Sequence, residues 1–177
     1  ATSCMIADAA AVATSASSAG AIEWKARWIS QEHCQSTTNS WLAFKHIHHI
    51  DSVPSSVVAS IAADSRYWLW INGEPVVREG GLKRGPAPGD SYFDRVEIAP
   101  YLKQGDNMIA VLVWHFGKNG FSHLNSGTAA LLFQAEGDGV EICSQTKGWQ
   151  CSVHKGFGTA LPLVNRRLPE SSIRYEA

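Results

Sequence analysis

The sequence predicts an all-β fold, either a β-sandwich or a barrel. From Trp41 onward, short apolar runs are separated by Gly, Pro, Asp and Asn at the spacing of strands and turns. Apolar and polar residues alternate within several of these runs, and no helical period is sustained over a dozen residues after position 41. With 177 residues, of which 45% are hydrophobic, the chain is long enough for one domain with a substantial core.

The expected strands follow one another with short connections. Alternation across residues 57–64 indicates a half-buried strand, whereas residues 108–115 are apolar in both phases and predict a central strand covered on both faces. Val96 and Ile98 alternate with charged neighbours, as in a strand near an edge. We expect strands at residues 41–50, 57–63, 66–72, 75–79, 91–98, 107–115, 128–135, 139–145 and 149–154.

Three connections carry specific predictions. Asn72-Gly73 favours a tight hairpin, and Pro100 followed by Gly105 favours one helical turn within residues 98–107. A loop centred on Lys147 would place Cys143 opposite Cys151 in a hairpin, which predicts a disulfide between them. Two separate buried thiols stay open as the alternative.

Charge and composition exclude some partners. The chain has 15 basic and 16 acidic residues, so there is no basic excess to neutralise phosphates, and we expect no nucleic-acid partner. The longest apolar runs, at residues 110–114 and 129–133, are far below the ~20 residues of a spanning helix, so we expect no membrane partner. Residues 1–22 are rich in Ala and Ser, and we interpret them as a low-complexity lead-in or linker. Both chain ends are expected to be cuts in a longer polypeptide.

The motifs of common enzyme classes are missing from the sequence. It contains no Gly-x-Ser-x-Gly elbow, phosphate loop, dinucleotide fingerprint or His-Glu-x-x-His pair. His46 and His48 share one strand face, but no further ligand lies at a suitable spacing, so histidines in or beside the core are favoured over a metal site. Trp68 and Trp70 point away from Tyr67 and Leu69, which leaves two indoles for packing, for a partner domain or for a sugar ring.

Residues 61–133, IAADSRYWLWINGEPVVREGGLKRGPAPGDSYFDRVEIAPYLKQGDNMIAVLVWHFGKNGFSHLNSGTAALLF, closely resemble the N-terminal β-sandwich module of bacterial α-L-rhamnosidase-type enzymes of glycoside hydrolase family 78. The tail RRLPESSIRYEA at 166–177 is similar to the segment that leads out of that module, and residues 24–29 match its usual W-x-A-x-W-I opening. The resemblance implies a jelly-roll β-sandwich of the galactose-binding-domain-like type at residues 23–165, followed by a connector at 166–177.

The resemblance also implies a function. In this family the catalytic acids lie in a large α/α barrel, which this chain lacks, so the chain is expected to be a non-catalytic accessory module with that barrel domain as its partner. Some related modules bind L-rhamnose with the help of calcium, which makes a rhamnose-containing glycan a second expected partner. Asp90 and Asp94 are weak calcium candidates, although a solvated turn is the favoured interpretation, and no other cofactor is expected.

Two loops and one strand face are the expected contact regions. The loop at 116–126 gathers polar side chains beside an aromatic ring, which suits either a sugar or a neighbouring domain. The Gly-rich segment at 79–90 allows close approach of a backbone. A purely structural docking domain and a free-standing sugar-binding lectin stay open as alternatives. The candidate contact residues are Arg84, Asp90, Lys118, Asn119, Phe121, Ser122, His123, Trp68 and Trp70.

Overall fold

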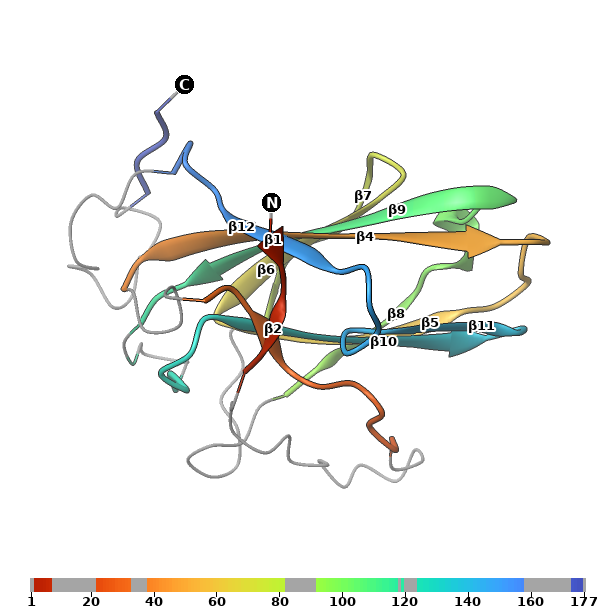
Figure 1. Ribbon diagram of the computed structural model, residues 1–177, viewed down its shortest axis with the longest axis horizontal. Helices are drawn as coiled ribbons and strands as arrows, with labels where there is room; N and C mark the ends of the chain where they lie inside the picture. Colours follow the sequence, from red (N-terminus) through yellow and green to blue (C-terminus); the bar gives the residue numbers. More distant parts are fainter. Residues whose placement is uncertain are drawn as a thin grey trace.

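The computed structural model describes residues 2–7, 22–32, 38–81, 92–117, 119, 124–157 and 173–176, and these form two antiparallel sheets packed face to face (Figure 1). The first sheet has the order β1 (Thr2–Ser3), β12 (Gln150–Val153), β4 (Ser40–Ile50), β9 (Gly105–His115), β6 (Arg66–Ile71) and β7 (Glu74–Gly81). The second has the order β2 (Met5–Ile6), β3 (Ile29–Ser30), β10 (Ala130–Gly137), β5 (Val58–Asp64) and β8 (Asp94–Glu97), with β11 (Val140–Cys143) also paired to β10. The predicted all-β sandwich is therefore confirmed.

The interior between the sheets is built from alternate residues of each strand. In β6 the inward side chains of Tyr67, Leu69 and Ile71 are fully buried, as the alternation predicts. Phe44, Val111, Ile61, Leu131 and Phe133 meet them from the other long strands. Burying each such side chain contributes about 1.5–3 kcal/mol, so this one layer dominates the stability of the sandwich.

The long strands lie where the sequence predicts. β9 is central, since it pairs with β4 along its whole length and with β6 on its other side. The predicted cover on both of its faces is incomplete, because Met108 on the outer face is 40% exposed. Among the described residues β8 pairs with β5 alone, which confirms the predicted edge position. Asn72 and Gly73 have φ of 53° and 87°, the left-handed backbone that a two-residue hairpin between β6 and β7 requires.

The predicted helical turn is shorter than expected. A single 3₁₀ turn, η1 (Ala99–Tyr101), has Pro100 near its start and ends at Leu102. Gly105 does not end this turn. With φ of 91°, it instead begins β9, because the chain needs a sharp reversal before entering the central strand.

The predicted hairpin of residues 139–154 is wrong, and so is the disulfide that depends on it. β11 pairs with β10 in the second sheet, while β12 pairs with β4 in the first. The segment between them crosses the sandwich, and the indole of buried Trp149 donates a hydrogen bond to the Cys143 carbonyl at 3.0 Å. Cys143 packs on the outer face of the second sheet and Cys151 faces the interior, and no disulfide joins them.

The N-terminal residues are part of the sandwich. β1 pairs with β12 and β2 pairs with β3, so residues 2–6 are strands rather than the predicted lead-in. Residues 8–21 lie outside the described residues. A second stretch, residues 22–28, lies over the outer face of the second sheet, where Trp24, Ala26 and Trp28 pack on Ala62, Ala130 and Leu132.

Within the described parts of the chain, no helix has the length and apolar character that crossing a membrane requires.

Candidate functional site

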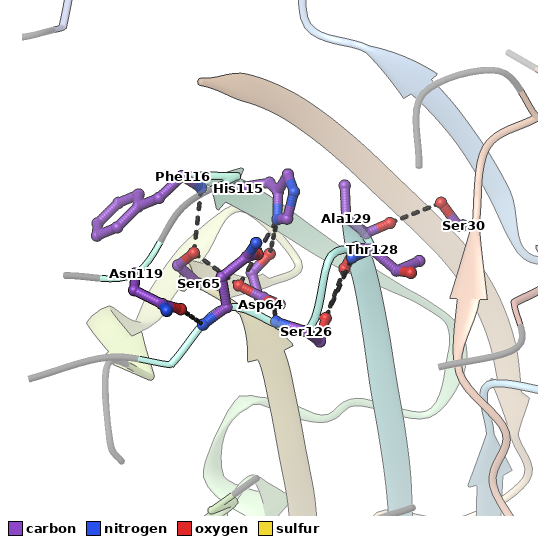
Figure 2. A network of polar contacts seen from close by, with 10 residues as sticks. Ser30, Asp64, Ser65, His115, Phe116, Asn119, Ser126, Thr128 and Ala129 are labelled. Atoms are coloured by element: carbon purple, nitrogen blue, oxygen red, sulfur yellow. Dashed lines mark hydrogen bonds and ion pairs between the residues drawn. The ribbon is translucent and has the colours of Figure 1, made fainter. Parts of the chain in front are cut away.

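A buried polar network lies at the end of the sandwich where β5 and β9 stop (Figure 2). The Asp64 carboxylate accepts hydrogen bonds from the Ser65 hydroxyl at 2.7 Å and from the Ser126 N–H at 2.6 Å. His115 Nδ1 lies 3.2 Å from the Asp64 carbonyl oxygen and 3.6 Å from its carboxylate. The Phe116 N–H donates to the Ser65 hydroxyl oxygen at 3.1 Å. We call these five residues the Asp64 network.

The Asp64 network holds both ends of the loop at 116–126. Phe116 begins this loop and Ser126 ends it, and each donates its backbone N–H to the network. Within the loop, the exposed Asn119 side chain accepts a hydrogen bond from the Asn125 N–H at 2.9 Å. The two described ends of the loop predicted to contact a ligand or a domain are thus held by buried polar groups.

The Asp64 network has the residue types of a catalytic triad without its geometry. A nucleophilic serine needs its hydroxyl hydrogen-bonded to a histidine, which in turn is oriented by a carboxylate. Here the Ser65 hydroxyl donates directly to Asp64, and His115 Nε2 is buried with no hydrogen-bond partner within the described chain. The arrangement therefore positions backbone and is not set up for nucleophilic attack.

Next to the network, aromatic rings stack on the outer face of the first sheet. Trp41 lies against Trp114 with ring centroids 4.8 Å apart, against Phe157 at 3.9 Å and against Trp68 at 5.5 Å. The Phe116 ring packs edge-on against Trp114, with ring centroids 4.6 Å apart. Phe116 belongs to both the Asp64 network and this aromatic stack. The start of the loop at 116–126 is therefore held by a backbone hydrogen bond and by ring packing.

From this stack an apolar band continues across the outer face of the first sheet. Trp68 and Trp70 of β6 lie opposite Leu112 and Ala110 of β9. Ile47 of β4 pairs with Met108 of β9, and their side chains are 54% and 40% exposed. We define the apolar band as Ile47, Met108, Ala110, Trp70, Leu112 and Trp68. Its two exposed members, Ile47 and Met108, are candidates for contact with another surface.

The structure brings together only part of the predicted contact set. Trp68 and Trp70 point outward from β6 as predicted, and Asn119 lies in the anchored loop. The remaining contact candidates lie outside the described residues: Arg84, Asp90, Lys118, Phe121, Ser122 and His123.

Asp94, one of the two weak calcium candidates, has a structural role. Its carboxylate accepts hydrogen bonds from the Tyr67 hydroxyl at 2.9 Å and from the Gly81 N–H at 3.2 Å, which ties β8 to β6 and β7. Burial, together with the nearby Asp94 charge, raises the pKa of Tyr67, which keeps this hydroxyl a donor. Among the described residues no three metal-ligating side chains gather, and Asp90 lies outside them.

The histidines of β4 occupy different environments. His46 is buried, with its ring stacked on Trp149 at 5.0 Å, as the core interpretation predicts. Burial lowers the pKa of His46 and of half-buried His48, since an imidazolium is poorly solvated there. Exposed His49 has a raised pKa because it hydrogen-bonds the Asp106 carboxylate at 2.7 Å.

Sequence reasoning missed the centre of this site. Asp64, Ser65 and His115 are ordinary strand-end residues in the sequence, and their meeting depends on the register between β5, β6 and β9. Trp41 and Trp114 are directly opposed, which also depends on register. The sequence feature that indicates this region is the doubly apolar run at 108–115, which places apolar side chains on the outer face of β9 as well.

Within the described residues, the fold is a two-sheet β-sandwich whose second sheet is covered on its outer face and whose first sheet leaves Ile47 and Met108 exposed. Among solved structures, a family 78 rhamnosidase of Bacillus sp. GL1 is similar at 32% identity with a TM-score of 0.67, over 77% of this chain and 14% of that chain. The predicted resemblance to family 78 rhamnosidases is therefore confirmed.

Two more distant enzymes share the fold. An α-L-rhamnosidase from Aspergillus terreus is 19% identical with a TM-score of 0.57, over 77% of this chain and 17% of that chain. An α-L-rhamnosidase from Dictyoglumus thermophilum is 16% identical with a TM-score of 0.58, over 80% of this chain and 18% of that chain. No family model and no curated protein matches the sequence. The chain spans less than a fifth of each of these enzymes.

Proposed function

We propose that this chain is a non-catalytic accessory module of an α-L-rhamnosidase-type glycoside hydrolase, and that its apolar band contacts another domain of the same polypeptide. The observation that carries the proposal is the 32% identity over 77% of this chain but only 14% of the Bacillus enzyme. In such an enzyme most of the polypeptide lies outside the module, and some of it must pack against the module.

The apolar band supports this choice of surface. The outer face of the second sheet is already covered by residues 22–28, whereas Ile47 and Met108 leave an apolar pair open to solvent on the first. Covering such a pair stabilises an interface by roughly 25 cal/mol per Å² of apolar surface removed from water. An α/α barrel offers helices whose apolar side chains fit a flat sheet face.

The proposal is tested by assaying this chain and the polypeptide that carries it with an aryl α-L-rhamnoside. The full polypeptide is expected to release the aryl alcohol and this chain alone is not. Met108→Asp in the full polypeptide is expected to lower its thermal stability while leaving the stability of this chain unchanged. Hydrolysis by this chain alone contradicts the non-catalytic role.

A sugar contact at the loop of residues 116–126 is the second candidate, and the anchoring of both loop ends favours it. Calorimetric titration of this chain with L-rhamnose, with and without calcium, tests it. His123→Ala in this loop and Arg84→Ala in the Gly-rich segment at 79–90 are expected to lower the heat released on binding. Both are also expected to reduce turnover in the full polypeptide. Absence of heat under both conditions leaves domain contact as the role, and strong binding in a polypeptide without hydrolase activity indicates a lectin.

A further inference from the structure

An N-terminal strap, residues 2–7, joins the two sheets at one edge of the sandwich. β1 pairs with β12 of the first sheet, then the chain crosses over and β2 pairs with β3 of the second (Figure 1). Beyond β2, the Ala7 N–H donates to the Trp28 carbonyl at 2.8 Å. The strap closes this edge with only a few backbone hydrogen bonds, and segments held in this way open easily.

Cys4 lies at the crossing point of the strap. Thr2 is directly opposite Cys151, and the Cys4 N–H donates to the Trp149 carbonyl at 3.3 Å, so Cys4 lies diagonally across from Cys151. Cys4 packs against the interior cluster to which buried Cys151 belongs, and each thiol shifts the pKa of the other. The Cys151 sulfur also lies 3.5 Å from the Ser30 carbonyl in β3. Both sulfurs therefore occupy the gap that the strap bridges.

Cys143 offers a contrast within the same chain. It lies on the outer face of the second sheet among Trp28, Ala62 and Leu132, whereas Cys4 and Cys151 both pack with the interior cluster between the sheets. The geometry thus selects one pair.

We propose that Cys4 and Cys151 form an intramolecular disulfide on exposure to a small-molecule disulfide such as oxidised glutathione, and that this bond fastens the strap to the sandwich. Partly exposed Cys4 reacts first, when the strap opens and its contact with Cys151 is lost: its thiolate attacks one glutathione sulfur, forms a mixed disulfide and releases one glutathione thiolate. Cys151 then attacks the Cys4 sulfur and releases the second glutathione. Two protein thiols are oxidised, one glutathione disulfide is reduced, and the two protons pass to the glutathione thiolates.

In the closed strap, contact with Cys151 and burial raise the pKa of Cys4, so we expect Cys4 to ionise and react when the strap opens. Once Cys4 is in the mixed disulfide it has no thiol proton to share, and Cys151 attacks its sulfur as the strap returns to its place beside β12. Closing a loop of nearly the whole chain restricts the unfolded state strongly, so we expect Tm to rise on the order of 10 °C.

The test incubates the 177-residue chain with oxidised glutathione, alkylates remaining thiols with iodoacetamide, and maps disulfides by mass spectrometry without reduction. The expected result is loss of two hydrogen atoms from the intact mass and a peptide pair linking Cys4 to Cys151. Dithiothreitol is expected to reverse both this mass change and the rise in Tm.

Two variants make the test specific. Cys143→Ser is expected to keep the link, and Cys4→Ser to lose it and the Tm change. Hydrogen exchange of residues 2–7 gives a second readout, since oxidation is expected to slow it in the wild type and not in Cys4→Ser. A link that uses Cys34, a mixed disulfide that stops at Cys4, or alkylation of both Cys4 and Cys151 overturns the proposal.

Discussion

The two sheets bury the same interior, but their outer faces differ. On the second sheet, Ala62, Ala130 and Leu132 are covered by residues 22–28. Gln134 holds that cover in place, since its side-chain oxygen accepts from the Lys25 and Ala26 N–H groups at 2.8 and 3.0 Å. On the first sheet, Phe157 covers Trp41, and the apolar band beyond it stays open at Ile47 and Met108. Among the described residues, one face is covered by the chain itself, and the other keeps an exposed apolar pair where we propose contact with another domain.

The largest expected effect separates these faces directly. Leu132→Asp places a charge under the cover of the second sheet and is expected to lower the free energy of unfolding by more than about 4 kcal/mol. Ile47→Asp on the apolar band is expected to change it by less than about 0.5 kcal/mol, since that side chain is exposed in this chain. Urea unfolding of both variants measures the difference. Equal losses of unfolding free energy in the two variants would contradict the distinction between the two faces.

The next effect concerns the Asp64 network. Asp64→Ala removes the acceptor of the Ser65 hydroxyl and the Ser126 N–H, and is expected to cost about 3 kcal/mol. Hydrogen exchange at Ser126 is expected to rise, because its anchor is lost. Asp51→Ala, at a fully exposed carboxylate, is the matched control. If Asp64→Ala has the same free energy of unfolding as this control, the ends of the loop are not anchored by the Asp64 network.

Removing the attachment of the cover is expected to cost less. Gln134→Leu loses three hydrogen bonds to residues 23–26 while keeping the side-chain volume, and is expected to lower the free energy of unfolding by about 2 kcal/mol. Trp24 and Trp28 are expected to become more accessible to fluorescence quenchers. Gln150→Leu, the same substitution at an exposed position of β12, is the control and is expected to leave both readouts unchanged. Unchanged quenching in Gln134→Leu would show that apolar contacts alone hold the cover.

The smallest effect is a dependence of stability on pH. The lowered pKa values of His46 and His48 mean that the unfolded chain binds protons more readily than the folded chain. Stability from these groups is complete above the ordinary pKa of 6.5 and falls as the pH drops toward their lower folded pKa values. His46→Gln is expected to reduce this slope in urea unfolding between pH 7 and 5, two values that bracket the ordinary histidine pKa of about 6.5. His49→Gln, whose pKa is shifted upward, is expected to leave it intact or steeper.

The strands were predictable from sequence because alternation and turn residues are local features. The residues of β9 are apolar in both phases, which correctly predicts a central strand, and Asn72-Gly73 correctly predicts a tight turn. The pairing partners of the strands were less predictable. The loop at 146–148 suits a hairpin, but the strand that follows it, β12, pairs in the other sheet. What decides this is Trp149, whose burial between the sheets outweighs local turn preference. The Asp64 network was missed for the same reason, since strand register alone brings its members together.

The most direct test of domain contact at the apolar band uses the chain's two methionines. Met108 lies in the apolar band on the first sheet and is 40% exposed, whereas Met5 lies in the N-terminal strap, in the edge strand β2 of the second sheet, and is 37% exposed. Peroxide oxidation of both is followed by mass spectrometry in this chain and in the full polypeptide. We expect similar rates for the two methionines in this chain, and in the full polypeptide a rate for Met108 about tenfold lower relative to Met5, because oxidation follows exposure. An unchanged ratio of the two rates would contradict contact at this face.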